Sequence, residues 1–202
     1  MSLSSALSVN ANLLSGDNST MKTLTGLVIG AFALATVSAA RPALADGHGH
    51  KHHHHGNLLK EIKKIVSNAE HAAVIAERRS AMHVLGGSMK QIGGYLKKGE
   101  GSAADVKAAA MAIEKIGKAI PKLFPAGTGM AAYKGVTGAK PTVHSDPAGF
   151  RKISQQMASL AAELAQAAGS GASKADLGAK FGNIGKVGCG GCHRTYREKL
   201  KK

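Results

Sequence analysis

The chain has 202 residues, a formal net charge of +15, no tryptophan and only 3% aromatic residues. This length suits one ordinary domain rather than two, and a core with few large aromatic side chains leaves space for something other than protein. The charge alone would allow nucleic acid as a partner, but the aromatic side chains that stack on bases are missing, so we expect no nucleic-acid binding. We expect the basic surface to meet an acidic protein partner instead.

Residues 21–45 have the features of an export signal. A short basic start at residues 21–23 (MKT) precedes an apolar stretch at residues 24–40, and Ala43-Leu44-Ala45 is an A-x-A cleavage site. We predict that translation starts at Met21 and that cleavage follows Ala45, with residues 1–20 as an extension outside the signal. The apolar run is too short, and its side chains are too small, for a membrane span, so no stable membrane insertion is expected after cleavage. An uncleaved anchor helix is the alternative.

Residues 46–57 (DGHGHKHHHHGN) form a low-complexity leader that holds six of the ten histidines. Short His-rich tracts can bind metal ions. We interpret this segment as a solvated, disordered leader with incidental metal affinity. Handling of copper, nickel or zinc is the alternative hypothesis.

Helical spacing of apolar residues begins after the leader. The first stripe runs from Leu58 to Leu96, in either one long helix or a short helix followed by a long one. Glycines within a helix weaken it by about 1 kcal/mol each and often mark a close approach by a bulky group. The glycines of this stripe are Gly86, Gly87, Gly93 and Gly94.

A second helix and a long connection are predicted next. Ser102 and Asp105 form a variant of the capping box, which predicts the start of a second helix. Pro121 predicts a break or kink near the end of that helix. The next stretch, to about residue 145, is rich in Gly and Pro and is predicted to be a long connection.

Two more helices complete the chain. Asp146 and Pro147 are an N-cap and a first-turn proline, and the apolar residues that follow have coiled-coil-like spacing. Ser173 caps a fourth helix, predicted to run through Leu200. No stretch alternates convincingly with period two. We therefore predict an all-α domain over residues 58–202, a four-helix bundle with one long connection.

The fourth helix contains Cys189 and Cys192, the only cysteines of the chain, followed directly by His193. This is the C-x-x-C-H pattern of c-type haem attachment. On a helix, residues i, i+3 and i+4 share a face, so both thiols can bond the haem and the imidazole can bind its iron. Gly190 and Gly191 would keep the backbone slim beside the ring. We predict one covalently bound haem c near the C-terminus.

Other uses of the two cysteines fit less well. A disulfide would close a very small loop and leave His193 unexplained. A thioredoxin-like pair needs a βαβ setting, and a zinc site needs four ligands. Export favours haem, because c-type haem is attached on the outer side of the bacterial inner membrane. We therefore predict a periplasmic protein.

Three separated segments resemble the class II c-type cytochromes, cytochrome c′ and its low-spin relatives. They are residues 78–90 (RRSAMHVLGGSMK), 123–128 (LFPAGT) and 181–197 (FGNIGKVGCGGCHRTYR). The resemblance spans about residue 69 to the end. It departs from the family in lacking a Trp after Pro141, and in an interval from Gly185 to Cys189 that is one residue longer.

The resemblance implies a role for the residue four positions after the first-helix Arg, which faces the distal side of the iron and is Met82 here. With His193 as the other axial ligand, Met82 would give a low-spin haem that carries single electrons. In the alternative, Met82 only fills the pocket above a five-coordinate iron that binds NO or CO, as in cytochrome c′. Met89 would compete with Met82 only if the register were different, and its expected role is core packing.

Further expectations follow from the same resemblance. Arg78 is expected beside a haem propionate, and Arg197 in the proximal pocket. His83 is expected to face solvent, and His71 and His144 to lie on the surface or in loops. Family members are often antiparallel homodimers.

The chain shows neither paired carboxylates in a plausible site nor a nucleophile–base constellation, so we expect no enzyme activity. The partner is expected to be a redox protein with an acidic face.

Overall fold

A computed structural model of the chain describes residues 50–200, with side chains from residue 56 onward. The predicted signal peptide, its cleavage site after Ala45 and the first residues of the leader lie outside the described residues. Between residues 50 and 200 the chain is helical, apart from turns and one isolated antiparallel bridge that pairs Ala139 with Arg197. The predicted all-α class is confirmed.

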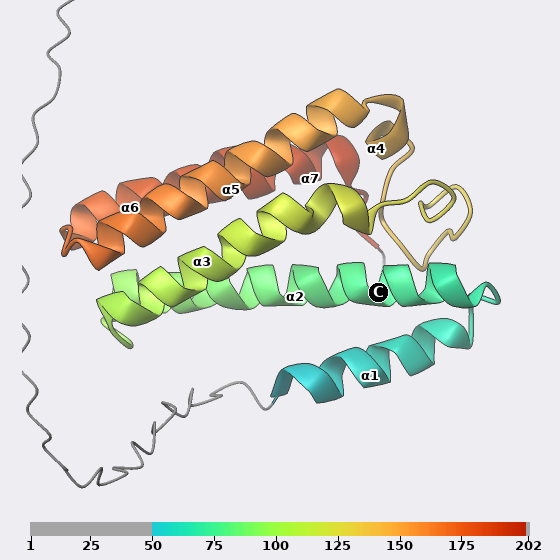
Figure 1. Ribbon diagram of the computed structural model, residues 1–202, viewed down its shortest axis with the longest axis horizontal. Coiled ribbons are helices and arrows are strands. Elements are labelled where there is room, and N and C mark those ends of the chain that lie inside the picture. The colour runs from blue at the N-terminus through green and yellow to red at the C-terminus, as the bar shows by residue number, and fades with distance from the viewer. Residues whose placement is uncertain (1–49, 201–202) are drawn as a thin grey trace, which may run out of the picture. The chain divides into compact units, whose positions relative to one another are not determined.

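Four helical segments that alternate in direction form the bundle (Figure 1). They are α2 (Ala69–Lys98), α3 (Ala103–Ala119), α5 (Pro147–Gly169) and a composite fourth segment of α6 (Lys174–Asn183), η2 (Ile184–Gly190) and α7 (Gly191–Tyr196). Helix α5 packs against α3 on one side and against α6 and η2 on the other. The main core includes the fully buried residues Ile92, Val106, Ile113, Leu164, Leu177 and Ile184.

The helix starts agree with the capping residues. Ser102 and Asp105 form a reciprocal capping box at the start of α3. The side chain of Asp146 accepts a hydrogen bond from the backbone N–H of Gly149, and Ser173 caps α6 in the same way. These groups satisfy backbone donors that have no partner inside the helix, and the predicted starts are confirmed.

The end of α3 and the long connection also follow the sequence signals. Helix α3 ends at Ala119, and a 3₁₀ turn, η1 (Ile120–Leu123), takes its place where Pro121 occurs. Proline lacks the N–H that the next α-helical hydrogen bond requires. The connection then runs through turns to the short helix α4 (Thr142–Ser145).

The first apolar stripe is divided into two helices, which was one of the two alternatives. Helix α1 (His50–Lys63) precedes α2 and begins inside the predicted leader. It packs on α2 and on the connection after η1 through a second cluster, whose buried residues are Ile62, Val66, Ala72, Ile75 and Ala76. His71 is half-buried there, with Nδ1 at 2.8 Å from the hydroxyl of Tyr133, whereas we expected it on the surface.

The predicted extension of the last helix to Leu200 is wrong, because α7 ends at Tyr196. The following backbone pairs with the long connection instead of continuing the helix. The N–H of Glu198 donates to the carbonyl of Gly138 at 2.8 Å, and the N–H of Lys140 donates to the carbonyl of Tyr196 at 3.0 Å. These non-local partners replace the intrahelical hydrogen bonds that one more turn would provide.

The glycines expected to mark close approaches do so only in part. A Cβ atom at Gly94 would lie 2.7 Å from Oε2 of Glu100. At residues 86–87, a Cβ atom would meet no heavy atom within 4 Å. In contrast, a Cβ at Gly117 would lie 3.0 Å from the Cβ of Ala158, and one at Gly188 would lie 2.9 Å from the Cβ of Met157. These two glycines therefore allow α3 and η2 to approach α5 closely.

None of the helices within residues 50–200 combines the length and apolarity needed to cross a bilayer.

Candidate haem-binding site

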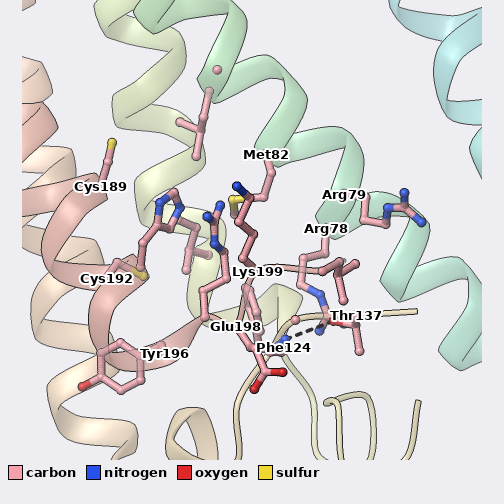
Figure 2. A pocket seen from close by; sticks show the side chains of 18 of the residues that line it. Arg78, Arg79, Met82, Phe124, Thr137, Cys189, Cys192, Tyr196, Glu198 and Lys199 are labelled. Carbon is pink, nitrogen blue, oxygen red and sulfur yellow. Dashed lines mark hydrogen bonds between the residues drawn. The ribbon is translucent and has the colours of Figure 1, made fainter. Parts of the chain in front are cut away.

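A cavity of about 650 Å³ opens between α2, η2, α7 and the long connection (Figure 2). Its volume lies within the range of about 300–1,000 Å³ that is common for bound small molecules. Most of its wall is apolar, and the apolar side chains include Met82, Leu85, Met89, Ile120, Phe124, Phe150 and Met157. The space expected from the aromatic-poor composition is therefore present in this cavity.

Cys189, Cys192 and His193 all line this cavity, so the three predicted attachment residues come together. Both cysteines are free and half-buried. Burial raises the pKa of the Cys189 thiol, and burial followed by the charge of Cys189 raises the pKa of Cys192 to about 11. Both thiols are thus protonated near neutral pH, which is unlike the low-pKa thiolates of redox-active pairs.

The backbone of the attachment segment is a π-helix, η2, which spans Ile184–Gly190 and joins α7 at Gly191. The longer hydrogen-bonded turn of a π-helix takes up one extra residue, and such turns are frequent at functional sites. The resemblance led us to expect one extra residue between Gly185 and Cys189, and a π-helix would accommodate such a residue. The π-helix keeps α6 packed in the bundle while the cysteines face the cavity.

Contrary to our expectation, Gly190 and Gly191 do not face the cavity. A Cβ atom at Gly191 would lie 2.7 Å from Cδ1 of Ile153 on α5, and one at Gly190 would lie 3.0 Å from the carbonyl oxygen of Gly185. Neither glycine lines the cavity. Their role is to allow close packing behind the attachment segment.

His193 presents its imidazole at the cavity wall. Partial desolvation, followed by the positive charge of Arg197, lowers the pKa of the imidazole below its usual value. The neutral ring that predominates at pH 7 is the form that binds a metal ion.

Met82 lies on α2, across the cavity from Cys189 and Cys192 (Figure 2). Its side chain is half-buried and packs against the main core. Met89, two turns further along α2, also packs against the core and lines the same cavity. His83 is exposed, as predicted, and lies at the cavity margin.

Arg78 ties α2 to the long connection. Its two terminal nitrogens donate to the carbonyl of Leu123 at 3.3 Å, to Oγ1 and the carbonyl of Thr128 at 3.2 and 2.8 Å, and to Oγ1 of Thr137 at 3.0 Å. The guanidinium also stacks on the ring of Phe124 at 4.5 Å. Burial lowers its pKa to about 10, so it stays charged at neutral pH. Only its Nε–H remains for a carboxylate, and the predicted contact with a propionate stays a prediction.

Arg197 lies at the end of α7, close enough to influence both His193 and Cys192 electrostatically. Its assignment to the proximal pocket also stays a prediction. The sequence did not predict Glu198, Lys199 and Leu200 as lining residues, because the last helix was expected to carry them onward. It gave no signal either for the lining loop at residues 136–139, apart from the length of the connection.

These residues fit a c-type haem. Two thiols three residues apart and a neutral imidazole face one apolar cavity of suitable size, and cationic side chains stand at its margin for the haem carboxylates.

Comparison with known proteins shows the family of the chain. A family model described as Cytochrome C′ matches residues 73–197. The chain is 32% identical over 133 residues to a cytochrome c′ of Rhodospirillum rubrum, which covers 66% of this chain and 87% of that protein. It is 33% identical over 130 residues to a cytochrome c′ of Pararhodospirillum photometricum, covering 64% of this chain and all of that protein.

Solved structures give the same answer. A cytochrome c′ with an unusual ligand-controlled dimer dissociation is 29% identical, with a TM-score of 0.56, and the match covers 62% of this chain and 95% of that one. The nitric oxide complex of a mutant cytochrome c prime from Alcaligenes xylosoxidans is 25% identical, with a TM-score of 0.55 and coverage of 64% and 97%. The predicted resemblance and the predicted four-helix bundle are confirmed, and the chain belongs to the cytochrome c′ family, whose members bind haem c.

Proposed function

We propose that this protein is an exported, periplasmic cytochrome c′ with one covalently attached haem, whose iron keeps an open position for NO or CO. The observation that carries the proposal is that apolar side chains of α2 line the same cavity as Cys189 of η2 and Cys192 and His193 of α7, in a chain of this family. One solved relative is a nitric oxide complex. When bound, haem supplies an iron centre that can change its oxidation state and take a diatomic ligand.

The side chains of this protein have separate tasks at that site. Cys189 and Cys192 hold the haem, and neutral His193 provides the proximal nitrogen. On the side of α2, Met82 and the buried Leu85 exclude water from the cavity and leave room for a small, weakly polar ligand. These two side chains would select by size and polarity, because neither Met82 nor Leu85 offers a charged group to the ligand.

The cavity wall at Phe124 is held in place from two sides. The guanidinium of Arg78 stacks on its ring, and the ring of Phe150 meets it edge-on with centroids 5.0 Å apart. Aromatic pairs in this geometry add about 0.5–1.5 kcal/mol beyond their buried area.

The second candidate is a one-electron carrier with Met82 and His193 as axial ligands, the function that we first derived from the sequence. It is favoured by the position of Met82, whose thioether belongs to the wall across from the attachment residues. Met and His together give a low-spin haem with a raised potential. The family favours the open site, and we place this candidate second.

Optical spectra of the purified ferric and ferrous protein, with and without CO, distinguish the two functions. An open site predicts a high-spin spectrum that changes strongly with CO, and Met82→Ala should stay high-spin. A low-spin spectrum that Met82→Ala converts to high-spin would instead establish Met82 as a ligand. Met111→Ala is the matched control, because Met111 is exposed on α3 and does not line the cavity.

Three further expectations belong to this proposal. We propose that the protein carries out no substrate-level catalysis, that it meets a redox partner with an acidic face, and that it forms a homodimer. One relative shows ligand-controlled dimer dissociation, so sedimentation with and without CO is the test of the last point.

Metal handling by the leader stays a hypothesis, and deletion of residues 47–56 without loss of copper, nickel or zinc affinity would exclude it.

A further inference from the structure

The C-terminal segment after α7 is fixed against the long connection at the cavity mouth. Arg197 forms an antiparallel bridge with Ala139, and the N–H of Glu198 donates to the carbonyl of Gly138. These contacts hold the extended backbone in a defined register. As a result, the next residue, Lys199, belongs to the cavity wall although it lies six residues beyond His193.

Three of the other charged residues around the cavity are already engaged or point elsewhere, and Arg197 is the exception. Arg78 uses both terminal nitrogens on the long connection. Arg197 lies near His193 and Cys192, and within residues 56–200 its side chain forms no salt bridge or hydrogen bond. Figure 2 shows Arg79 directed away from the cysteines, and the Glu198 side chain on the opposite side of its backbone from Lys199.

Lys199 is a second cation that lines the cavity without a partner among the described residues. Its side chain extends from the C-terminal segment toward α2, into the space that the cavity-lining residues share (Figure 2). Within residues 56–200, the salt bridges formed by lysines involve Lys64, Lys98, Lys118 and Lys180, and Lys199 makes neither a salt bridge nor a hydrogen bond. An ammonium group at the edge of an apolar cavity is stabilised by an anion.

A haem supplies two such anions, because its porphyrin carries two carboxylates. We propose that Lys199 binds one haem carboxylate through its Nζ, while the buried charge of Arg78 faces the other. This inference rests on the proposed haem. It assigns to the C-terminal segment the task of orienting the haem within its plane, with the ring held at its opposite edge by the two cysteines.

The test compares the haem-loaded wild type with Lys199→Gln, Lys199→Arg and Lys115→Gln. Lys115 is exposed on α3, does not line the cavity, and forms no ion pair among the described residues, so it controls for net charge. The readouts are the haem-methyl NMR shifts and the reduction potential, both recorded from pH 4 to 9, which report the ionisation of the haem carboxylates.

We expect the acid ionisation constant of one haem carboxylate to fall about tenfold in Lys199→Gln, because an adjacent cation favours the charged form. It should stay within about twofold of wild type in Lys199→Arg and Lys115→Gln. Arg79, Arg197 and Glu198 are present in every variant and do not contribute to the difference.

Equal shifts in Lys199→Gln and Lys115→Gln would overturn the assignment, since only net charge would then matter. The assignment would also be overturned if the optical spectrum of the wild type changed at alkaline pH and this change disappeared in Lys199→Gln, because the Lys199 amine would then bind the iron. CO binding is measured on the same samples. If the wild type does not respond to CO but Lys199→Gln still shifts the carboxylate ionisation as expected, only the gas-binding proposal is refuted.

Discussion

Gly117 on α3 offers a quantitative test of how the bundle is packed. A Cβ at this position would lie 3.0 Å from the Cβ of Ala158 and 3.2 Å from its Cα and backbone nitrogen. Carbon atoms at optimal contact are about 3.5–4.0 Å apart, so α3 and α5 would have to separate by about half an ångström. The obstructing atoms belong to a helix backbone and its Cβ and cannot rotate away. Overpacking of this kind costs about 1–3 kcal/mol.

Replacement of Gly117 by Ala also brings a gain of about 1 kcal/mol in helix propensity. We therefore expect Gly117→Ala to lower the free energy of unfolding by about 0–2 kcal/mol in total. Gly87→Ala is the matched control, because Gly87 is exposed on α2 with open space around it. It should gain about 1 kcal/mol.

Urea unfolding of the haem-loaded proteins, followed by far-ultraviolet circular dichroism, measures both changes. The difference between the two variants isolates the overpacking cost of about 1–3 kcal/mol, because the propensity gain is common to both. The haem spectrum should be unchanged, since neither glycine lines the cavity. Equal stabilisation by both substitutions would refute the close approach of α3 and α5.

Two further predictions concern the fourth helical segment. The Tyr196 hydroxyl donates to Asp146 at 2.6 Å, which lowers the pKa of Asp146 and raises that of Tyr196 to about 12. The contribution of Asp146 to the free energy of unfolding is present above its unfolded pKa near 3.8 and is lost as the pH falls below that value. The contribution of Tyr196 is present below pH 10 and is lost between pH 10 and about 12. In unfolding titrations, Tyr196→Phe should remove the alkaline loss and weaken the acid one, and an unchanged pH profile would contradict the coupling. Deletion of Lys186 should turn η2 into an α-helix, and haem attachment and the unfolding midpoint should stay close to wild type. Deletion of Ala179 from α6 should instead rotate the residues on one side of the deletion by about 100° around the helix axis and destabilise the protein. Similar loss of haem and stability in both deletions would argue against this explanation of the π-helix.

Local sequence signals predicted most of the helix starts. Asp146 and Ser173 cap helices through hydrogen bonds to backbone groups only three residues away, so the neighbouring sequence is sufficient. Pro121 ends α3 for an equally local reason, its missing N–H. The C-x-x-C-H pattern was recognisable too, because the chemistry predicted for it depends on a spacing of three and four residues.

Other features depend on partners far away in the chain. The last helix ends at Tyr196 because Gly138 and Lys140 provide hydrogen-bond partners for the backbone at that point. Arg78 was expected at a propionate, but the position of Thr128 and Thr137 around its guanidinium depends on how the long connection folds back onto α2. No local pattern predicts such contacts.

The sequence by itself determined the helical class, the attachment motif and the family, because each depends on periodicity or on a short spacing. The tertiary structure decided the path of the long connection, the π-helix that turns the cysteines toward the cavity, and the presence of Lys199 at the cavity mouth. The physical reason is that these features depend on hydrogen bonds and close contacts between segments that only the folded chain brings together.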